Sequence, residues 1–175
     1  SFTTPGMEEF ISGVILFDET LYQSTLKDNL PYPEYLSNLG VVPGIKVDKG
    51  AHKLAGADGE KITSGLDGLE DRLKKYYELG ARFAKWRAVI TIGESVPSRT
   101  CVKANAHALA RYAALCQEYG LVPIVEPEIL MDGSHTINDS FLVTGEVLHT
   151  VFNELFDQNV VLEVIVLKPN MVLSG

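Results

Sequence analysis

Charged residues close four apolar runs of the sequence, and in three of these runs two charges lie two residues apart. The pairs are Lys46 with Asp48, Lys85 with Arg87 and Glu126 with Glu128, and the fourth run ends in Lys168 alone. Lysine and arginine bind anionic groups, and a lysine set beside a glutamate can move protons near neutral pH. The pattern therefore predicts acid–base chemistry on an anionic substrate.

The spacing of two also predicts where these side chains point. In a β-strand, residues i and i+2 project from the same face. The intervening residues are apolar and suit an outer face covered by helices; they are Ala84, Trp86, Val125 and Pro127. We therefore expect the charged pairs to point inward at the carboxyl ends of neighbouring strands. The alternative is that each pair only caps a strand end and neutralises itself.

Lys168 ends an apolar run and precedes Pro169, which favours an extended backbone. A lysine at the end of a buried strand loses hydration, and the cations Lys85 and Arg87 are expected across from it. Both effects lower the pKa of an amine, and a neutral amine is the nucleophile that forms an imine. A permanent ion pair between Lys168 and Glu126 explains the same residues equally well.

The composition excludes several classes of protein. The chain has 175 residues, 46% hydrophobic and 22% charged, which is typical of a globular domain and not of a disordered one. The formal net charge of −8 argues against nucleic acid as a partner, and no apolar stretch is long enough for a membrane span. The histidines and cysteines lack metal-binding spacing, so we expect no metal and no cofactor. Cys101 and Cys116 indicate buried thiols of a reducing, cytoplasmic compartment.

Five short apolar runs rich in branched residues predict β-strands buried on both faces. These runs are Gly13–Phe17, Val41–Val47, Arg82–Arg87, Leu121–Glu126 and Val161–Lys168. Amphipathic patterns predict helices between them, at Tyr32–Leu39, Leu66–Tyr76, Leu109–Tyr119 and Phe141–Leu155. The alternation indicates an α/β fold with a parallel sheet. Because no G-x-G-x-x-G turn follows the first strand, a closed (β/α)8 TIM barrel is favoured over an open sheet.

Several segments resemble class I fructose-bisphosphate aldolase, in order and at matching spacing over essentially the whole chain. They are Gly13–Glu19 (GVILFDE), Gly44–Gly50 (GIKVDKG), Leu66–Leu69 (LDGL), Phe83–Arg87 (FAKWR), Ala104–Cys116 (ANAHALARYAALC), Val125–Leu130 (VEPEIL) with Asp132-Gly133, and Leu167–Val172 (LKPNMV). The resemblance implies a metal-independent lyase that is cytoplasmic and homotetrameric. It implies cleavage of fructose 1,6-bisphosphate to dihydroxyacetone phosphate and glyceraldehyde 3-phosphate, and the reverse condensation.

The resemblance also implies a role for each charged residue. Lys168 matches the lysine that forms the Schiff base, and Glu126 matches the acid/base group that handles dehydration of the carbinolamine. Lys85 matches a lysine that aids catalysis and contacts substrate, and Lys46 matches one near a substrate phosphate. Three further residues match charged positions that support the active site in the family; they are Asp48, Arg87 and Glu128.

The chain departs from the family at its ends and at one internal position. The family's first strand carries an aspartate that assists carbon–carbon cleavage, and this strand lies outside residues 1–175. The family's last two strands, which hold a phosphate site, and its C-terminal tail also lie outside these residues. We therefore expect residues 1–175 to be one domain with about five of the barrel's eight βα units, inactive on its own. Val164 stands where the family usually has glycine, which predicts crowding of the barrel interior near Lys168.

Two other functions fit part of the pattern. Another Schiff-base barrel, such as a transaldolase, would share the reactive lysine, but the Glu126-Pro127-Glu128 segment argues against it. A non-catalytic aldolase-like scaffold or protein-binding fragment would keep the fold without the reaction. Borohydride trapping with fructose 1,6-bisphosphate separates the catalytic functions from the scaffold.

Overall fold

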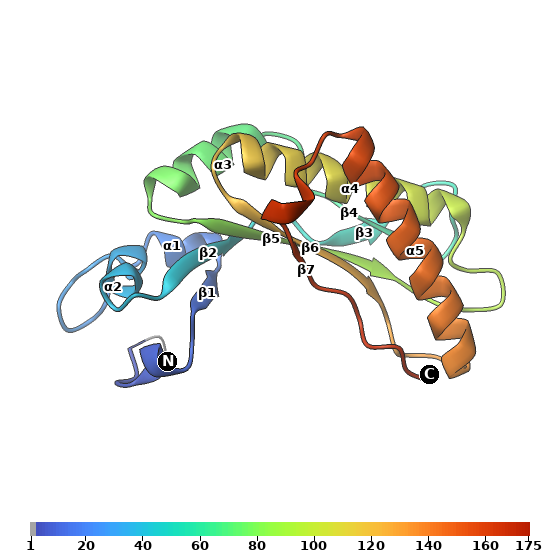
Figure 1. The fold of residues 1–175 in the computed structure, drawn as a ribbon, viewed down its shortest axis with the longest axis horizontal. Helices are drawn as coiled ribbons and strands as arrows, with labels where there is room; N and C mark the ends of the chain where they lie inside the picture. The colour runs from blue at the N-terminus through green and yellow to red at the C-terminus, as the bar shows by residue number, and fades with distance from the viewer. Residues whose placement is uncertain (1–2) are drawn as a thin grey trace.

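Five parallel strands form the main sheet of the computed structural model, which describes residues 3–175 (Figure 1). In both chain order and spatial order they are β1 (Gly13–Leu16), β2 (Val42–Lys46), β5 (Phe83–Ile90), β6 (Val122–Ile129) and β7 (Val166–Leu167). The helices are α1 (Asp18–Leu21), α2 (Tyr32–Asn38), α3 (Leu69–Glu78), α4 (Arg99–Glu118) and α5 (Ile137–Asp157). Strands that neighbour each other both in the sheet and along the chain, with helices between them, form consecutive units of a (β/α)8 barrel. The fold class predicted from the sequence is confirmed.

Helices α3, α4 and α5 lie on one face of the sheet (Figure 1). The buried residues of β5 alternate along the strand and are Ala84, Trp86, Ala88 and Ile90. Trp86 stacks on Tyr112 of α4 with ring centroids 5.4 Å apart, and the Tyr112 hydroxyl donates to the Ala84 carbonyl at 2.7 Å. These contacts place the apolar face of β5 under α4. Lys85 and Arg87 therefore project from the opposite, inner face, as their spacing predicts.

The two central strands continue three residues beyond their predicted ends, to Ile90 in β5 and to Ile129 in β6. Their pairing persists to the bond from the Leu130 N–H to the Ile90 carbonyl at 2.8 Å. The charged pairs of these strands therefore lie inside the strands and not at their ends. The apolar residues that follow each pair keep the alternation of buried and partly exposed positions, which extends the strands.

The fifth strand is much shorter than predicted. Only Val166–Leu167 pair with β6, and Leu162–Val164 form a 3-10 turn, η2. Gln117 of α4 holds this turn, because its amide oxygen accepts from the Val161 N–H at 2.9 Å and its amide nitrogen donates to the Val161 carbonyl at 2.8 Å. In η2, Val164 is 44% exposed. Val164 therefore lies in a turn before β7 and not within the predicted strand. Whether it crowds the interior of a complete barrel stays a prediction.

Three short elements have no counterpart in the sequence-based prediction. They are the 3-10 turn η1 (Met7–Glu9) and the antiparallel strands β3 (Ala51–Lys53) and β4 (Lys61–Thr63). Helix α1 is also new and spans only four residues. Elements of three or four residues are too short to repeat a helix or strand pattern twice, so hydrophobic periodicity cannot reveal them. No helix within residues 3–175 is long and apolar enough to span a membrane.

The two cysteines are free and buried on α4, as predicted. Burial, with a contribution from the charge of Glu60, raises the pKa of the Cys101 thiol to about 11, and burial also raises the pKa of Cys116. Only the thiolate reacts, and each unit of raised pKa lowers the thiolate fraction about tenfold. We therefore expect Ellman's reagent at pH 8 to label both cysteines at least about 100-fold more slowly in the native protein than in guanidinium. Rapid labelling of either native thiol would contradict this.

Strands β1 and β7 each have a neighbour on one side only within residues 3–175. Large apolar side chains are exposed on or directly after these strands; they are Ile15, Phe17 and Val166. Unpaired strand edges are templates for association with other chains. We expect the 175-residue chain to self-associate with rising concentration, measured by sedimentation velocity. Val166→Lys, which puts a charge on the β7 edge, should reduce association, and a chain that stays monomeric throughout would disprove the expectation.

Candidate active site

Glu126 is the buried centre of a charge cluster on the inner face of the sheet. Its side chain is 2% exposed, and its two carboxylate oxygens face two different lysines. Oε1 accepts a hydrogen bond from Lys168 Nζ at 2.6 Å, and Oε2 lies 3.0 Å from Lys85 Nζ. A buried charge is tolerated only when it is paired, and these two ammonium groups supply the pairing. One carboxylate is thus shared by two amines from the strand segments on either side of it.

The two oxygens of Glu126 differ in their surroundings. Oε1 is engaged in a hydrogen bond with Lys168. Oε2 is shielded from solvent and accepts no hydrogen bond from the described residues, so Lys85 faces it as an ion pair without hydrogen-bond alignment. A carboxylate with one oxygen on an amine and free lone pairs on the other is equipped to take up and return a proton.

Lys168 follows directly on β7, and its side chain is 58% exposed. This exposure belongs to an edge strand, because β7 has a neighbour on one side only within residues 3–175. The desolvation of Lys168 in a complete barrel stays a prediction. The ion pair with Glu126, which was the alternative from the sequence, is present. The pair also places a proton acceptor directly on the amine, which imine formation requires.

Lys46 and Asp48 form a second ion pair, with Nζ and Oδ1 2.6 Å apart. Asp48 is 3% exposed and also accepts from the backbone N–H groups of Gly50 at 3.1 Å and Arg87 at 3.4 Å. The last bond joins the end of β2 to the middle of β5. Asp48 therefore fixes the position of Lys46 relative to the strand that carries Lys85 and Arg87.

Arg87 and Glu128 form the third pair, a hydrogen bond between Nε and Oε2. Both side chains are partly exposed. The hydrogen bond with Glu128 is the main cause that raises the pKa of Arg87, and burial acts in the opposite direction. Arg87 is therefore a permanent cation on the inner face, beside the Glu126 cluster.

The structure divides the predicted site residues between two cavities that share no lining residue. Arg87, Glu126, Glu128 and Lys168 line a cavity of about 440 Å³ at the carboxyl ends of β5 and β6. Lys46 and Asp48 line a second cavity of about 420 Å³, together with Asp18 and Arg72. Lys85 joins the first group through its contact with Glu126. The predicted convergence holds for five of the seven residues, and the Asp48 bond to β5 connects the other two.

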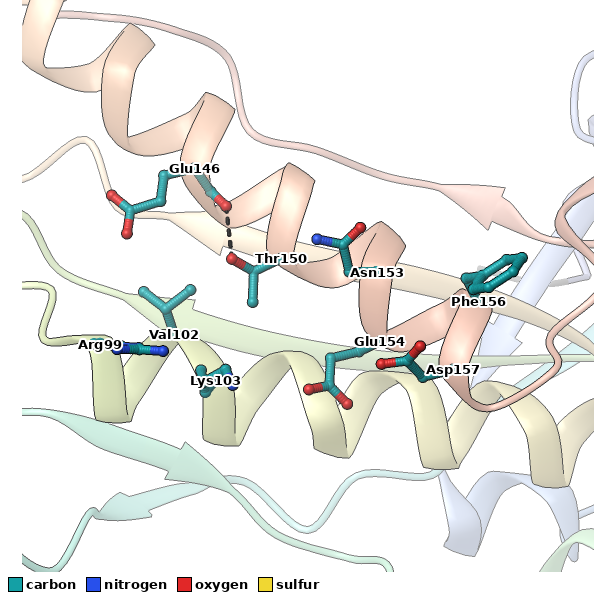
Figure 2. Close-up of a pocket in the computed structure, with 9 residues that line it drawn as sticks. All are labelled: Arg99, Val102, Lys103, Glu146, Thr150, Asn153, Glu154, Phe156 and Asp157. Carbon is teal, nitrogen blue, oxygen red and sulfur yellow. Dashed lines mark hydrogen bonds between the residues drawn. The ribbon is translucent and has the colours of Figure 1, made fainter.

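A larger groove of about 530 Å³ lies between α4 and α5, on the helix side of the sheet (Figure 2). Its lining includes Arg99, Lys103, Glu146, Glu154 and Asp157. The only polar contact drawn between its lining residues is the hydrogen bond from the Thr150 hydroxyl to the Glu146 carbonyl (Figure 2). None of the predicted site residues lines this groove, so its size alone does not make it the candidate site.

Sequence reasoning missed several residues that hold the site in place. The Thr63 hydroxyl of β4 donates to the Arg87 carbonyl at 2.8 Å, and Asn105 of α4 donates to the Lys61 carbonyl at 2.9 Å, so the hairpin is fastened to both β5 and α4. Asn170 and Thr144 connect the segment after Lys168 to the rest of the barrel. A polar residue directly after the proline that follows a strand, as in Lys168-Pro169-Asn170, is the one sequence signal that could have identified Asn170.

Fold and site together define a class of protein, part of a parallel (β/α)8 barrel with lysines gathered on a buried carboxylate on the inner face of its sheet. No group of three or more His, Cys, Asp or Glu side chains in residues 3–175 is arranged to hold a metal ion. A lysine amine beside a proton acceptor is the arrangement used by enzymes that bind carbonyl substrates as imines.

The family model for fructose-bisphosphate aldolase class I matches residues 1–175, and the chain belongs to this family. A probable fructose-bisphosphate aldolase class 1 of Xanthomonas axonopodis is 62% identical over 173 residues, which are 99% of this chain and 52% of the relative. Cytosolic fructose-bisphosphate aldolase 4 of Arabidopsis thaliana is 59% identical over 174 residues, which are 99% of this chain and 44% of the relative.

A solved structure of Plasmodium falciparum fructose-bisphosphate aldolase, in complex with TRAP and a small-molecule inhibitor, superposes with a TM-score of 0.95 at 50% identity. The match covers 99% of this chain and 50% of that one. The chain spans about half the length of the curated relatives it matches.

Proposed function

We propose that this chain carries the imine-forming centre of a class I aldolase. The proposed reaction cleaves fructose 1,6-bisphosphate to dihydroxyacetone phosphate and glyceraldehyde 3-phosphate, and runs in reverse as an aldol condensation. The observation that carries the proposal is the buried Glu126 carboxylate in contact with the amines of Lys168 and Lys85. Family membership supports the choice of substrate.

In the first stage, the Lys168 ammonium gives a proton to Glu126 Oε1, 2.6 Å away. The freed amine adds to the C2 carbonyl carbon of the sugar, and its remaining extra proton moves to the carbonyl oxygen to give a carbinolamine. Protonated Glu126 then returns its proton to the hydroxyl, which leaves as water, and a positively charged imine remains. Atoms and charge balance without any further reagent.

In the second stage, the iminium nitrogen is the electron sink for breaking the C3–C4 bond. The bonding electrons move toward the nitrogen and leave an enamine on Lys168, and the C4 half departs as an aldehyde. The C4 hydroxyl must lose its proton in this step. The family resemblance assigns that proton to an aspartate of the family's first strand, which lies outside residues 1–175. This chemistry calls on no metal and no cofactor.

The remaining charges bind and orient the anionic substrate. Lys85 faces Glu126 Oε2 and supplies a positive charge beside the reacting carbon. The ion pair with Asp48 fixes Lys46, to which the family resemblance gives the role of contacting one phosphate. Arg87 and Glu128 border the same cavity as Lys168 and support the substrate hydroxyls and charges. Each of these assignments combines a matching family position with a contact described above.

We further propose a cytoplasmic homotetramer, from the family resemblance. Two Arabidopsis relatives are named cytosolic, and a pea relative is named a cytoplasmic isozyme. The two free thiols agree with a reducing compartment. Sedimentation equilibrium distinguishes a tetramer from a smaller assembly.

The decisive experiment assays a completed barrel, in which residues 3–175 replace the matching segment of the Xanthomonas axonopodis relative. Formation of both triose phosphates from fructose 1,6-bisphosphate, unaffected by EDTA, is the expected result. The unmodified relative is the positive control. A well-folded completed barrel that forms neither product would support the alternative, a protein-binding scaffold. That alternative is motivated by the Plasmodium relative, which was solved with TRAP.

A further inference from the structure

A proline in β6 prevents Lys168 from continuing the ladder of β7. Leu167 is level with Val125 on β6, so Lys168 is level with Glu126. The Lys168 N–H still donates to the Val125 carbonyl at 2.9 Å. In a parallel pair, the next bond runs from the N–H of residue 127 to the Lys168 carbonyl. Residue 127 is proline and has no N–H, so the pairing stops at the residue that carries the amine.

A side chain takes over where the ladder stops. The next N–H of β6 that faces β7 belongs to Ile129, and it donates to Asn170 Oδ1 at 3.3 Å. Asn170 Nδ2 donates to Thr144 Oγ1 of α5 at 3.1 Å and to the Met171 carbonyl, also at 3.1 Å. Thr144 is buried, with 6% exposure. We call the contacts of Ile129, Asn170 and Thr144 the Asn170 clamp.

The clamp lies close enough along the chain to control the Lys168 amine. Only Pro169 separates Lys168 from Asn170, and its ring fixes its own φ torsion. The Lys168 side chain is 58% exposed, and its single ion-pair partner among residues 3–175 is Glu126. Packing therefore contributes little to its position, and the direction of the backbone contributes most.

We propose that Asn170 is a positioning residue that holds the Lys168 amine on the Glu126 carboxylate. The catalytic importance of this contact rests on the proposed function, because both concern the Lys168 amine. Its physical content is independent of that function: breaking the clamp should release Lys168 from Glu126 whether or not an imine ever forms.

The test uses the 175-residue chain, diluted until it is monomeric, and two measurements by mass spectrometry. Hydrogen exchange of the Ile129 amide reports the clamp, and acetic anhydride labelling of Lys168, relative to exposed Lys53, reports the freedom of the amine. Asn170→Ala should speed both by about three- to tenfold, the range that one hydrogen bond supports. Labelling needs no sugar recognition, so it remains informative if borohydride trapping fails.

Matched variants separate positioning from general destabilisation. Thr144→Val, which removes the acceptor at constant shape, should act like Asn170→Ala, and Thr144→Ser should restore native values. Asn153→Ala and Thr150→Val, made on the same helix where it borders the groove between α4 and α5 (Figure 2), should change neither measurement. The proposal is overturned if Ile129 exchange accelerates while Lys168 labelling stays within about 1.5-fold of the parent. A change that small lies below the effect expected from losing one hydrogen bond. If Asn170→Ala fails to fold, the Thr144 pair decides alone.

Discussion

Lys168→Arg in the completed barrel should abolish covalent trapping by borohydride in the presence of fructose 1,6-bisphosphate. Borohydride reduces an imine to a stable secondary amine, so an imine-forming lysine leaves one labelled peptide. A guanidinium stays protonated in proteins and cannot form the imine. The ion pair with Glu126 can persist in the variant, so the loss isolates the nucleophile from its charge. Peptide mapping by mass spectrometry measures the adduct.

The control for this experiment is Lys103→Arg, on the exposed side of α4, which should trap like the unmodified protein. The critical comparison is with Lys85, because its amine touches the same carboxylate as that of Lys168. An adduct on Lys85 or Lys46 in place of Lys168 would reassign the nucleophile.

Glu126→Gln should slow turnover of the completed barrel by about 10²- to 10⁴-fold, the contribution of a positioned proton-transfer group. Glutamine keeps the shape of the side chain but cannot accept a proton from Lys168. Imine formation and dehydration should suffer most, and substrate affinity should change less, because the phosphate-binding cations are untouched. Stopped-flow kinetics and steady-state KM separate the two effects.

Glu128→Gln is the matched control, because Glu128 lines the same cavity but pairs with Arg87 and touches neither amine. It should reduce turnover far less than Glu126→Gln. Turnover of Glu126→Gln within about twofold of the parent would be well below the smallest general acid–base contribution of about 10²-fold. If Glu128→Gln then slows turnover more, the two roles must be exchanged.

The sequence was sufficient for the architecture because its strongest signals are regular. Long apolar runs separated by amphipathic helices identify parallel βα units, and spacing by two residues assigns side chains to one face. The same reasoning correctly placed Lys85 and Arg87 on the face opposite Trp86. Regular periodicity was thus enough to predict the parallel sheet and the side chains on its inner face.

The prediction failed where single side chains replace regular backbone bonds. Val161–Lys168 is apolar enough to be a strand, but Gln117 captures its first part in a turn and Pro127 ends its pairing. The exposure of Lys168 follows from the place of β7 at an edge of the sheet, where it has a neighbour on one side only within residues 3–175. Asn170 was missed because its partners lie 41 and 26 residues away in the sequence.

The sharing of Glu126 between two lysines has a consequence for how ligands arrive. Each of the other two pairs, Lys46–Asp48 and Arg87–Glu128, is neutral, so the whole group keeps one uncompensated positive charge. The chain as a whole carries −8. An approaching anion is therefore repelled by most of the surface and attracted at the carboxyl ends of the strands. Such a field guides diffusion, and salt screens it beyond about 8–10 Å at physiological ionic strength. Encounter rates of phosphorylated ligands with this site should therefore depend on ionic strength, even where their final affinity does not.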